Sequence, residues 1–192
     1  NNPDILFNKK VLEKGAKIVK EINREVAALL GINAAARTTC VKPSGNASVL
    51  LQTASGIHAE HSQMYIRNVQ MTKDSEVTQA IQKANPYMVE DSVWSATNSD
   101  VVVSFPIIPK KGSYVKEDLI GVDHLEKVKL VQQHWVNAGT NIELCADKGV
   151  RHNVSNTILV DDWHEVEEYV YKNRHSFAGI SFLSMTGDKD FN

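Results

Sequence analysis

The segment Lys42-Pro43-Ser44-Gly45-Asn46-Ala47-Ser48 has the residue types that an anion-binding turn requires. Pro43 favours a turn, and Gly45 has no side chain to keep a ligand away from the backbone. A helix that starts here leaves its first backbone N–H groups without intrahelical acceptors, which suits a phosphate. Further donors and positive charge come from the side chains of Ser44, Asn46, Ser48 and Lys42.

A second interpretation of the same segment is an ordinary strand-to-helix turn, in which Ser44 or Asn46 caps the helix. The segment has neither the Gly-x-x-x-x-Gly-Lys pattern of a P-loop nor the Gly-x-Gly-x-x-Gly pattern of a dinucleotide site. The residues alone therefore leave both interpretations open.

The next segment, Ser55-Gly56-Ile57-His58-Ala59-Glu60-His61-Ser62, places two imidazoles and a carboxylate close together. A transition-metal or acid/base role is one interpretation, and contact with a substrate is another. The His-x-x-His spacing is common, so a hydrogen-bonded or solvent-facing loop is favoured over a metal site. Arg67 follows, and it either pairs with a phosphate or projects into solvent.

Cys40 and Cys145 are the two cysteines, and they are far apart in the sequence with no second sulfur at metal-binding spacing. Neither a disulfide scaffold nor a cysteine zinc site is indicated, and a reducing cytoplasm fits best. We expect both thiols to be small buried groups rather than nucleophiles. Trp135 and Trp163 fall on helical stripes and are expected in the core.

These candidates must be positioned by alternating helices and strands. Three helices are predicted first: one within residues 1–30, one from residue 47 onward, and one after Asp74 or Ser75. The first has an apolar stripe that ends before Gly31 and consists of Val11, Ile18, Ile22, Val26 and Leu29. Further helices are predicted from capping boxes at 123–126, ending at Gly139, and at 162–165. Strands are predicted over 37–42, 64–71, 101–108, 153–160 and 177–183, with Pro106 at an end, an edge or a bulge.

This alternation is typical of an α/β fold with a largely parallel sheet, in one layered or barrel-like unit. A length of 192 residues, with 42% hydrophobic and 23% charged residues, fits one globular core. A net charge of -2 provides no basic excess, so nucleic acid is not an expected partner. No run of about 18 apolar residues occurs, so no membrane span is expected.

Three motifs occur in a fixed order: Thr38-Thr39-Cys40-Val41-Lys42-Pro43-Ser44-Gly45, Ser55-Gly56-Ile57-His58 and Tyr65-Ile66-Arg67. This series resembles the Lys-Pro-Ser-Gly-Thr, Gly-Ile-His and Tyr-Ile-Arg run of adenosylcobalamin-dependent (class II) ribonucleotide reductases. Residues 128–135, 152–157 and 177–183 are similar to the closing part of that family's catalytic domain. The resemblance covers roughly residues 36 to 192.

The resemblance implies an α/β chain that contributes the final strands and helices of a ten-stranded barrel, so residues 1–192 are expected to be a C-terminal fragment of that catalytic domain. The absence of Met at Asn1 agrees with this expectation. The resemblance further implies that the di- or triphosphate of a ribonucleotide is held by Pro43, Ser44, Gly45, Asn46, Ala47 and Ser48, with Lys42, His58 and Arg67 nearby. Asn46 stands where the family commonly has Thr, and it retains the ability to cap and donate.

In the family, adenosylcobalamin initiates thiyl-radical chemistry at a cysteine in an Asn-x-Cys-x-Glu loop, which this chain lacks. No catalytic residue and no metal ligand is therefore assigned, and the chain alone is expected to be inactive. The implied partners are a ribonucleotide, an N-terminal catalytic portion, a dithiol reductant such as thioredoxin, and a second copy through an exposed barrel edge. The alternative hypothesis is a noncatalytic phosphate- or nucleotide-binding module or an assembly subunit.

Overall fold

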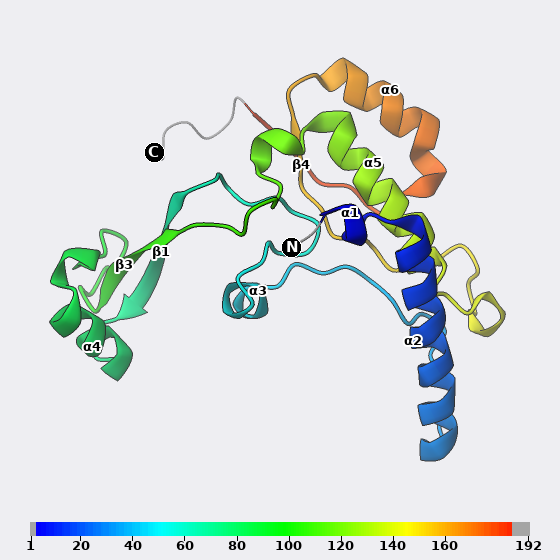
Figure 1. Cartoon of the computed structure of the whole chain (residues 1–192), viewed down its shortest axis with the longest axis horizontal. Helices are drawn as coiled ribbons and strands as arrows, with labels where there is room; N and C mark the ends of the chain where they lie inside the picture. The colour runs from blue at the N-terminus through cyan, green and yellow to red at the C-terminus, as the bar shows by residue number, and fades with distance from the viewer. Residues whose placement is uncertain (1–2, 186–192) are drawn as a thin grey trace. The chain divides into compact units, whose positions relative to one another are not determined.

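The computed structural model describes residues 3–185 (Figure 1). The chain forms two compact units, one joining the residues up to Glu60 with those from Lys110 onward, and one comprising His61–Pro109. The expectation of a single core is therefore wrong. The physical reason is that residues 61–109 close their own sheet, and they bury Val101, Val103 and Thr78 within it.

The first unit is mainly helical (Figure 1). Its helices are α1 (Pro3–Leu6), α2 (Lys9–Leu30), α3 (Asn46–Leu50), α5 (Gly121–Val131) and α6 (Trp163–Asn173). A π-helical segment, η3 (Gln132–Asn137), continues α5, and short 3₁₀ turns are η2 (Lys116–Asp118), η4 (Ile142–Leu144) and η5 (Arg174–Ser176). Its strands are β4 (Ile158–Val160) and β5 (Phe182–Ser184), which pair in parallel.

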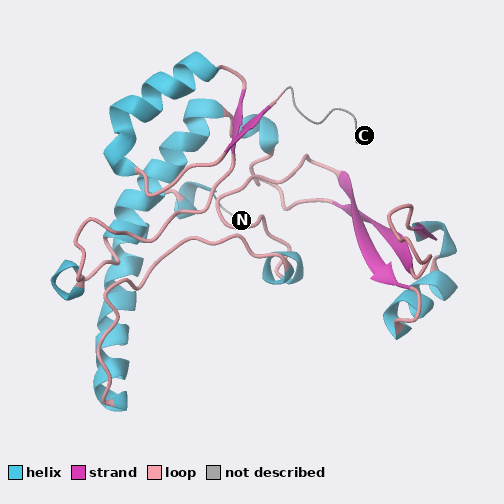
Figure 2. Ribbon diagram, turned by 180° about the vertical axis from the view of Figure 1, so that it is seen from behind, coloured by secondary structure: helices cyan, strands magenta, loops and turns pink. Residues whose placement is uncertain are grey.

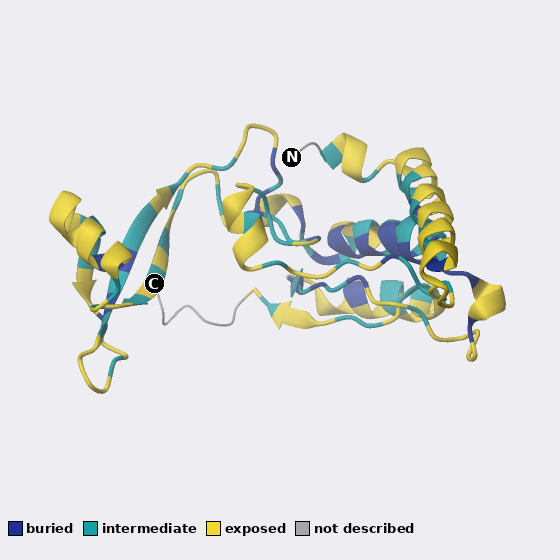
Figure 3. Ribbon diagram, turned by 90° about the horizontal axis from the view of Figure 1, so that it is seen from below, coloured by how far each residue is buried: buried dark blue, intermediate teal, exposed yellow. Residues whose placement is uncertain are grey.

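The core of the first unit gathers around α5, as Figure 3 shows by burial. Leu125, Val128 and Val131 recur on one face of this helix and are all buried. They pack with buried residues from β4, from α6 and from two loops, namely Ile57, Val136, Val154, Ile158, Val160 and Val166. This cluster ties residues before Glu60 to residues after Lys110, so the first unit is continuous in space although interrupted in sequence.

Helix α2 ends where the sequence predicts, because Gly31 adopts the left-handed conformation (φ 65°) and caps it. Its apolar stripe is not part of the core, however. The five residues of the stripe are 43% to 85% exposed in the first unit, whereas Ala16 and Ala27 are buried. The reason is close packing through small residues: a Cβ added to Gly15 would lie 3.2 Å from the Trp135 ring.

The second unit is an antiparallel sheet with one covering helix (Figure 2). Its elements are β1 (Tyr65–Thr72), α4 (Glu76–Ala84), the 3₁₀ turn η1 (Pro86–Met88), β2 (Val89–Asp91) and β3 (Asp100–Ile107), and the strand order is β1-β3-β2. Val103 lies opposite both Val69 and Val89 and is fully buried. Strand β2 does not reach Pro106, so this proline lies on an open edge, as predicted.

The expected largely parallel sheet is wrong for the described residues, because the three-stranded sheet is antiparallel and parallel pairing is limited to β4 with β5 and to two isolated bridges. Strand order along the chain does not fix which strands become neighbours. The strand predicted over 37–42 is reduced to isolated bridges at Arg37 and Val41, and the two C-terminal strands are three residues each. Within residues 3–185, no helix is long and apolar enough to cross a membrane.

The two predicted capping boxes have different outcomes. Asp162 caps α6 by accepting hydrogen bonds from the backbone N–H groups of His164 (2.9 Å) and Glu165 (3.1 Å). Helix α5, by contrast, starts at Gly121, before the predicted box, and its N-cap is Ile120. Asp123 is therefore inside the first turn, where its charge still favours the positive end of the helix.

Candidate functional site

The predicted phosphate turn leads directly into α3, and its N-cap residue is Gly45 rather than Ser44 or Asn46. Gly45 has φ −69°, a conformation that any residue adopts, so glycine is not required here by the backbone. A Cβ added at Gly45 would meet nothing within 4 Å. The turn is therefore open to the outside at this position.

Two serines of the turn bond to each other. Ser44 Oγ accepts a hydrogen bond from the Ser48 backbone N–H at 3.1 Å, and the Ser48 hydroxyl donates to the Ser44 carbonyl oxygen. The N–H groups at the very start of α3, at Asn46 and Ala47, have no acceptor within the helix. Both of these residues are exposed, as are Lys42, Pro43 and Gly45. The turn thus presents backbone donors rather than free serine hydroxyls.

The loop with the Ser-Gly-Ile-His sequence packs against this turn. Ser55 Oγ accepts a hydrogen bond from the Ser44 N–H at 2.6 Å and donates to the Ser44 carbonyl oxygen at 3.0 Å. Gly56 has φ 62°, and a Cβ there would lie 3.2 Å from the Lys42 carbonyl oxygen. Two of the three sequence motifs are therefore in contact, and Gly56 is the glycine that this contact requires.

A buried histidine from α5 supports the same loop. His124 Nε2 lies 3.1 Å from the carbonyl oxygen of Ile57, and the imidazole is 3% exposed. Burial is the main reason that the His124 pKa falls to about 4; the Ile57 hydrogen bond opposes this shift and nearby His58 adds to it. The neutral ring donates from Nε2 to the carbonyl. The sequence placed His124 only in a capping box, so its supporting role was missed.

Each histidine of the loop makes a contact of its own in the described structure. His58 Nδ1 lies 2.8 Å from the Ser55 carbonyl oxygen, whereas His61 belongs to the second unit and packs edge-on against Tyr65. Among residues 3–185, no group of three or more His, Cys, Asp or Glu side chains could hold a metal ion. The half-buried His58 is hydrogen-bonded, which matches the interpretation favoured from the sequence.

Arg67 also belongs to the second unit, where it lies on β1. Its Nη2 donates to the Tyr65 hydroxyl at 2.8 Å, and its guanidinium lies 5.7 Å from the Tyr65 ring centroid. The side chain is half-buried, so it does not simply project into solvent. Arg67 and the phosphate turn belong to different units, and the role of Arg67 near the phosphates stays a prediction.

The two cysteines differ. Cys40 is exposed, so the expectation that it is buried in a strand is wrong; the segment is extended without a full strand, and the neighbouring Thr39 takes the buried position. Cys145 is buried as predicted, with its Sγ 3.4 Å from the Asn141 carbonyl oxygen. Trp135 packs against the core and donates to the Cys40 carbonyl oxygen at 3.1 Å. Trp163 is 52% exposed beside Phe182, which corrects its predicted core position.

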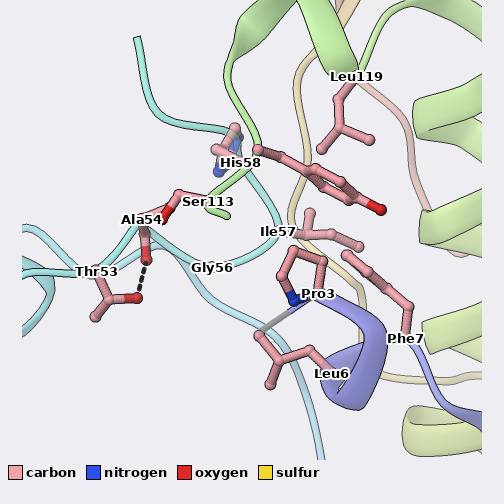
Figure 4. A pocket seen from close by; sticks show the side chains of 11 residues that line it. Pro3, Leu6, Phe7, Thr53, Ala54, Gly56, Ile57, His58, Ser113 and Leu119 are labelled. Carbon is pink, nitrogen blue, oxygen red and sulfur yellow. Dashed lines mark hydrogen bonds between the residues drawn. The ribbon is translucent and has the colours of Figure 1, made fainter. Parts of the chain in front are cut away.

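A small pocket lies beside the supporting loop (Figure 4). Its volume is about 70 Å³, and Leu6, Phe7, Ile57 and Leu119 give it a mainly apolar lining, with His58 at one side. A pocket of this size admits only a few water molecules. It is therefore too small to enclose a nucleotide.

The fold matches a solved class of enzyme. The structure aligns with a B12-dependent (class II) ribonucleotide reductase with a TM-score of 0.75 and 20% sequence identity, over 93% of this chain and 23% of that chain. The fold is thus of the ribonucleotide reductase type.

Sequence comparisons lead to the same class. The chain is 29% identical over 123 residues to a probable adenosylcobalamin-dependent ribonucleoside-triphosphate reductase of Dictyostelium discoideum, covering 64% of this chain. It is 26% identical over 175 residues to the adenosylcobalamin-dependent ribonucleoside-triphosphate reductase of Euglena gracilis, covering 90% of this chain. The chain spans 16% and 22% of these relatives, respectively. No family model matches it. These similarities confirm the resemblance to class II ribonucleotide reductases.

Proposed function

We propose that this chain is part of an adenosylcobalamin-dependent ribonucleotide reductase, an oxidoreductase that makes 2′-deoxyribonucleotides for DNA replication from ribonucleoside di- or triphosphates. Within that enzyme, residues 1–192 form a C-terminal part of the catalytic barrel, and the parallel pair β4–β5 belongs to its final strands. The names of both relatives favour a triphosphate substrate.

The chain's contribution is the site for the substrate phosphates, formed by Pro43, Ser44, Gly45, Asn46, Ala47 and Ser48. The observation that carries this assignment is the double hydrogen bond between Ser55 and Ser44, which joins two motifs that the resemblance assigns to one enzyme. The turn is open at Gly45, and its leading N–H groups are unpaired donors suited to phosphate oxygens. The exposed Lys42 adds a positive charge.

Adenosylcobalamin supplies the radical that starts nucleotide reduction when it is bound to the whole enzyme. This chain lacks the Asn-x-Cys-x-Glu loop of the family's radical chemistry. We therefore assign the catalytic cysteines to the rest of the enzyme. The residues described here bind and orient the substrate phosphates.

The remaining partners follow from the same proposal. They are the rest of the enzyme and a dithiol reductant such as thioredoxin. The proposed location is the cytoplasm. Strand β5 also carries exposed apolar side chains, with Phe182 39% and Leu183 48% exposed. Such side chains favour contact with the rest of the barrel or with a second copy.

A substitution at Gly45 tests the phosphate site. Gly45→Val is expected to weaken binding of a nucleoside triphosphate, because the branched side chain fills the open approach to the backbone donors. Its melting temperature should stay close to that of the unchanged chain, since the new side chain meets nothing within 4 Å at Cβ. Unchanged binding in a calorimetric titration would count against the site. Nucleotide reduction by this chain alone, with adenosylcobalamin and a dithiol, would contradict the assignment of the catalytic cysteines to the rest of the enzyme.

A further inference from the structure

The hydroxyl of Ser55 engages both polar backbone atoms of Ser44. It accepts from the Ser44 N–H at 2.6 Å and donates to the Ser44 carbonyl oxygen at 3.0 Å, across 11 positions of sequence. Both serines are half-buried, so water competes only in part for these bonds. The Ser48 hydroxyl, from the next turn of chain, donates to the same carbonyl oxygen.

The orientation of that carbonyl fixes the next N–H. In a trans peptide the C=O and N–H bonds of one unit point in opposite directions. Because Ser55 and Ser48 hold the Ser44 carbonyl on their side, the N–H of Gly45 must point to the opposite side. A flip of this single peptide would replace that donor with a carbonyl oxygen, which repels a phosphate.

The loop that carries Ser55 is itself fixed at several points. Gly56 packs closely against the Lys42 carbonyl, and the buried Ile57 is held through its carbonyl oxygen by His124. His58 bonds to the carbonyl oxygen of Ser55 at 2.8 Å. The position of Ser55 is therefore fixed by its own loop and does not depend on the conformation of the phosphate turn.

We propose that Ser55 is a positioning residue for the phosphate turn: its hydroxyl selects the orientation of the Ser44–Gly45 peptide in which the Gly45 N–H faces the phosphate of a nucleotide. This inference rests on the proposed function of the turn. Ser55 does not contact the phosphate; it acts through the backbone of Ser44. Ser48 shares only the bond to the carbonyl, so loss of Ser55 frees the Ser44 N–H as well.

The test compares three substitutions in the 192-residue chain. Ser55→Ala removes the hydroxyl, and Ser55→Thr keeps one. Ser62→Ala is the matched control, because it removes another serine hydroxyl that donates to a carbonyl, that of Met64 at 2.7 Å, in the other unit. Backbone amide NMR spectra are recorded for each protein during titration with inorganic triphosphate, and melting temperatures are measured in parallel.

In the unchanged chain, triphosphate should shift the Gly45 and Asn46 amide signals, and the Ser44 amide proton should lie downfield because of its short bond. Ser55→Ala should lose that downfield position and bind triphosphate about tenfold more weakly, which corresponds to loss of roughly one hydrogen bond. Ser55→Thr should recover most of the affinity, and Ser62→Ala should match the unchanged chain. A fold that is only weakened would shift the melting temperature without moving the Ser44 signal selectively.

The outcomes separate the two proposals. If the unchanged chain shows no amide shifts at Gly45 and Asn46 with triphosphate, the phosphate site itself is wrong, and the role of Ser55 falls with it. If the unchanged chain binds and Ser55→Ala binds equally well, the phosphate site stands and the role of Ser55 is overturned.

Discussion

The buried imidazole of His124 donates to the carbonyl oxygen of Ile57, with 3.1 Å between Nε2 and O. The two residues are 67 positions apart, so a residue of α5 fixes the loop that supports the phosphate turn. Burial, rather than this hydrogen bond, favours the neutral ring and lowers the His124 pKa. Protonation of His124 would leave a buried charge, which links the stability of this region to pH.

Stability should therefore fall in mild acid. Folding lowers the His124 pKa from 6.5 to about 4, so the unfolded chain binds the proton more tightly than the folded chain. The stabilising contribution is complete above pH 6.5 and is lost as the pH falls toward 4. Between pH 7 and pH 5 the free energy of unfolding should drop by about 2 kcal/mol through this residue.

Urea unfolding at both pH values, with two variants, measures this contribution. His124→Gln keeps a donor for the Ile57 carbonyl but cannot titrate, so its loss of stability between the two pH values should be smaller. His164→Gln, at an exposed position of α6, should retain the full loss. An equal pH dependence in all three proteins would rule out His124 as the source.

A second prediction concerns the close approach of Gly139 to Thr39. A Cβ at Gly139 would lie 2.6 Å from Thr39 Cγ2 and 2.8 Å from Thr39 Cβ, which is too close for any real contact. Gly139→Ala should therefore cost about 1–3 kcal/mol of unfolding free energy. Gly45→Ala is the matched control and should be nearly neutral, because the added carbon meets nothing within 4 Å.

The double variant Gly139→Ala with Thr39→Ala distinguishes the clash from a loss of backbone freedom. Removing the Thr39 side chain removes the clash, although it also removes the hydrogen bond from Thr39 Oγ1 to the Trp135 carbonyl oxygen at 2.7 Å. The two costs should thus be less than additive. Strict additivity would show that the Thr39 side chain is not what excludes a Cβ at Gly139.

A third prediction concerns Gln132, a buried amide that joins η3 to the backbone of residues 152–154. Its Nε2 donates to the His152 carbonyl oxygen at 3.1 Å, and its Oε1 accepts from the Val154 N–H at 3.3 Å. Gln132→Leu removes the partner of both groups, leaves the buried Val154 N–H unpaired and should cost about 1–3 kcal/mol. The same change at Gln133, which is only half-buried, should cost less than about 1 kcal/mol in chemical unfolding.

The N-cap of α6 gives a fourth prediction. Asp162→Ala removes the acceptor for the N–H groups of His164 and Glu165 and should lower the unfolding free energy by about 1 kcal/mol. Ser75 is the N-cap of α4, and its side chain makes no capping bond, so Ser75→Ala should have little effect. Similar losses in thermal unfolding of both variants would contradict the capping role of Asp162.

Local features of the fold were predictable because they depend on neighbours in sequence. Gly31 ends α2 by its left-handed backbone, and Asp162 starts α6 through bonds to residues two and three positions later. Strands β1 and β3 were predicted from their apolar and β-branched composition. The burial of α2 was not predictable, because Gly15 and Ala16, rather than the apolar stripe, pack in this structure.

The sequence by itself determined the phosphate-turn hypothesis and the resemblance to class II ribonucleotide reductases, because both depend on motifs that can be read along the chain. Only the tertiary structure decided that Ser55 pairs with Ser44 and that His124 supports Ile57. It also decided that Cys40 is exposed and that Arg67 falls in a separate unit. The physical reason is that these outcomes depend on contacts between segments that are distant in sequence. Residue type and spacing do not determine which distant backbone atoms come into contact.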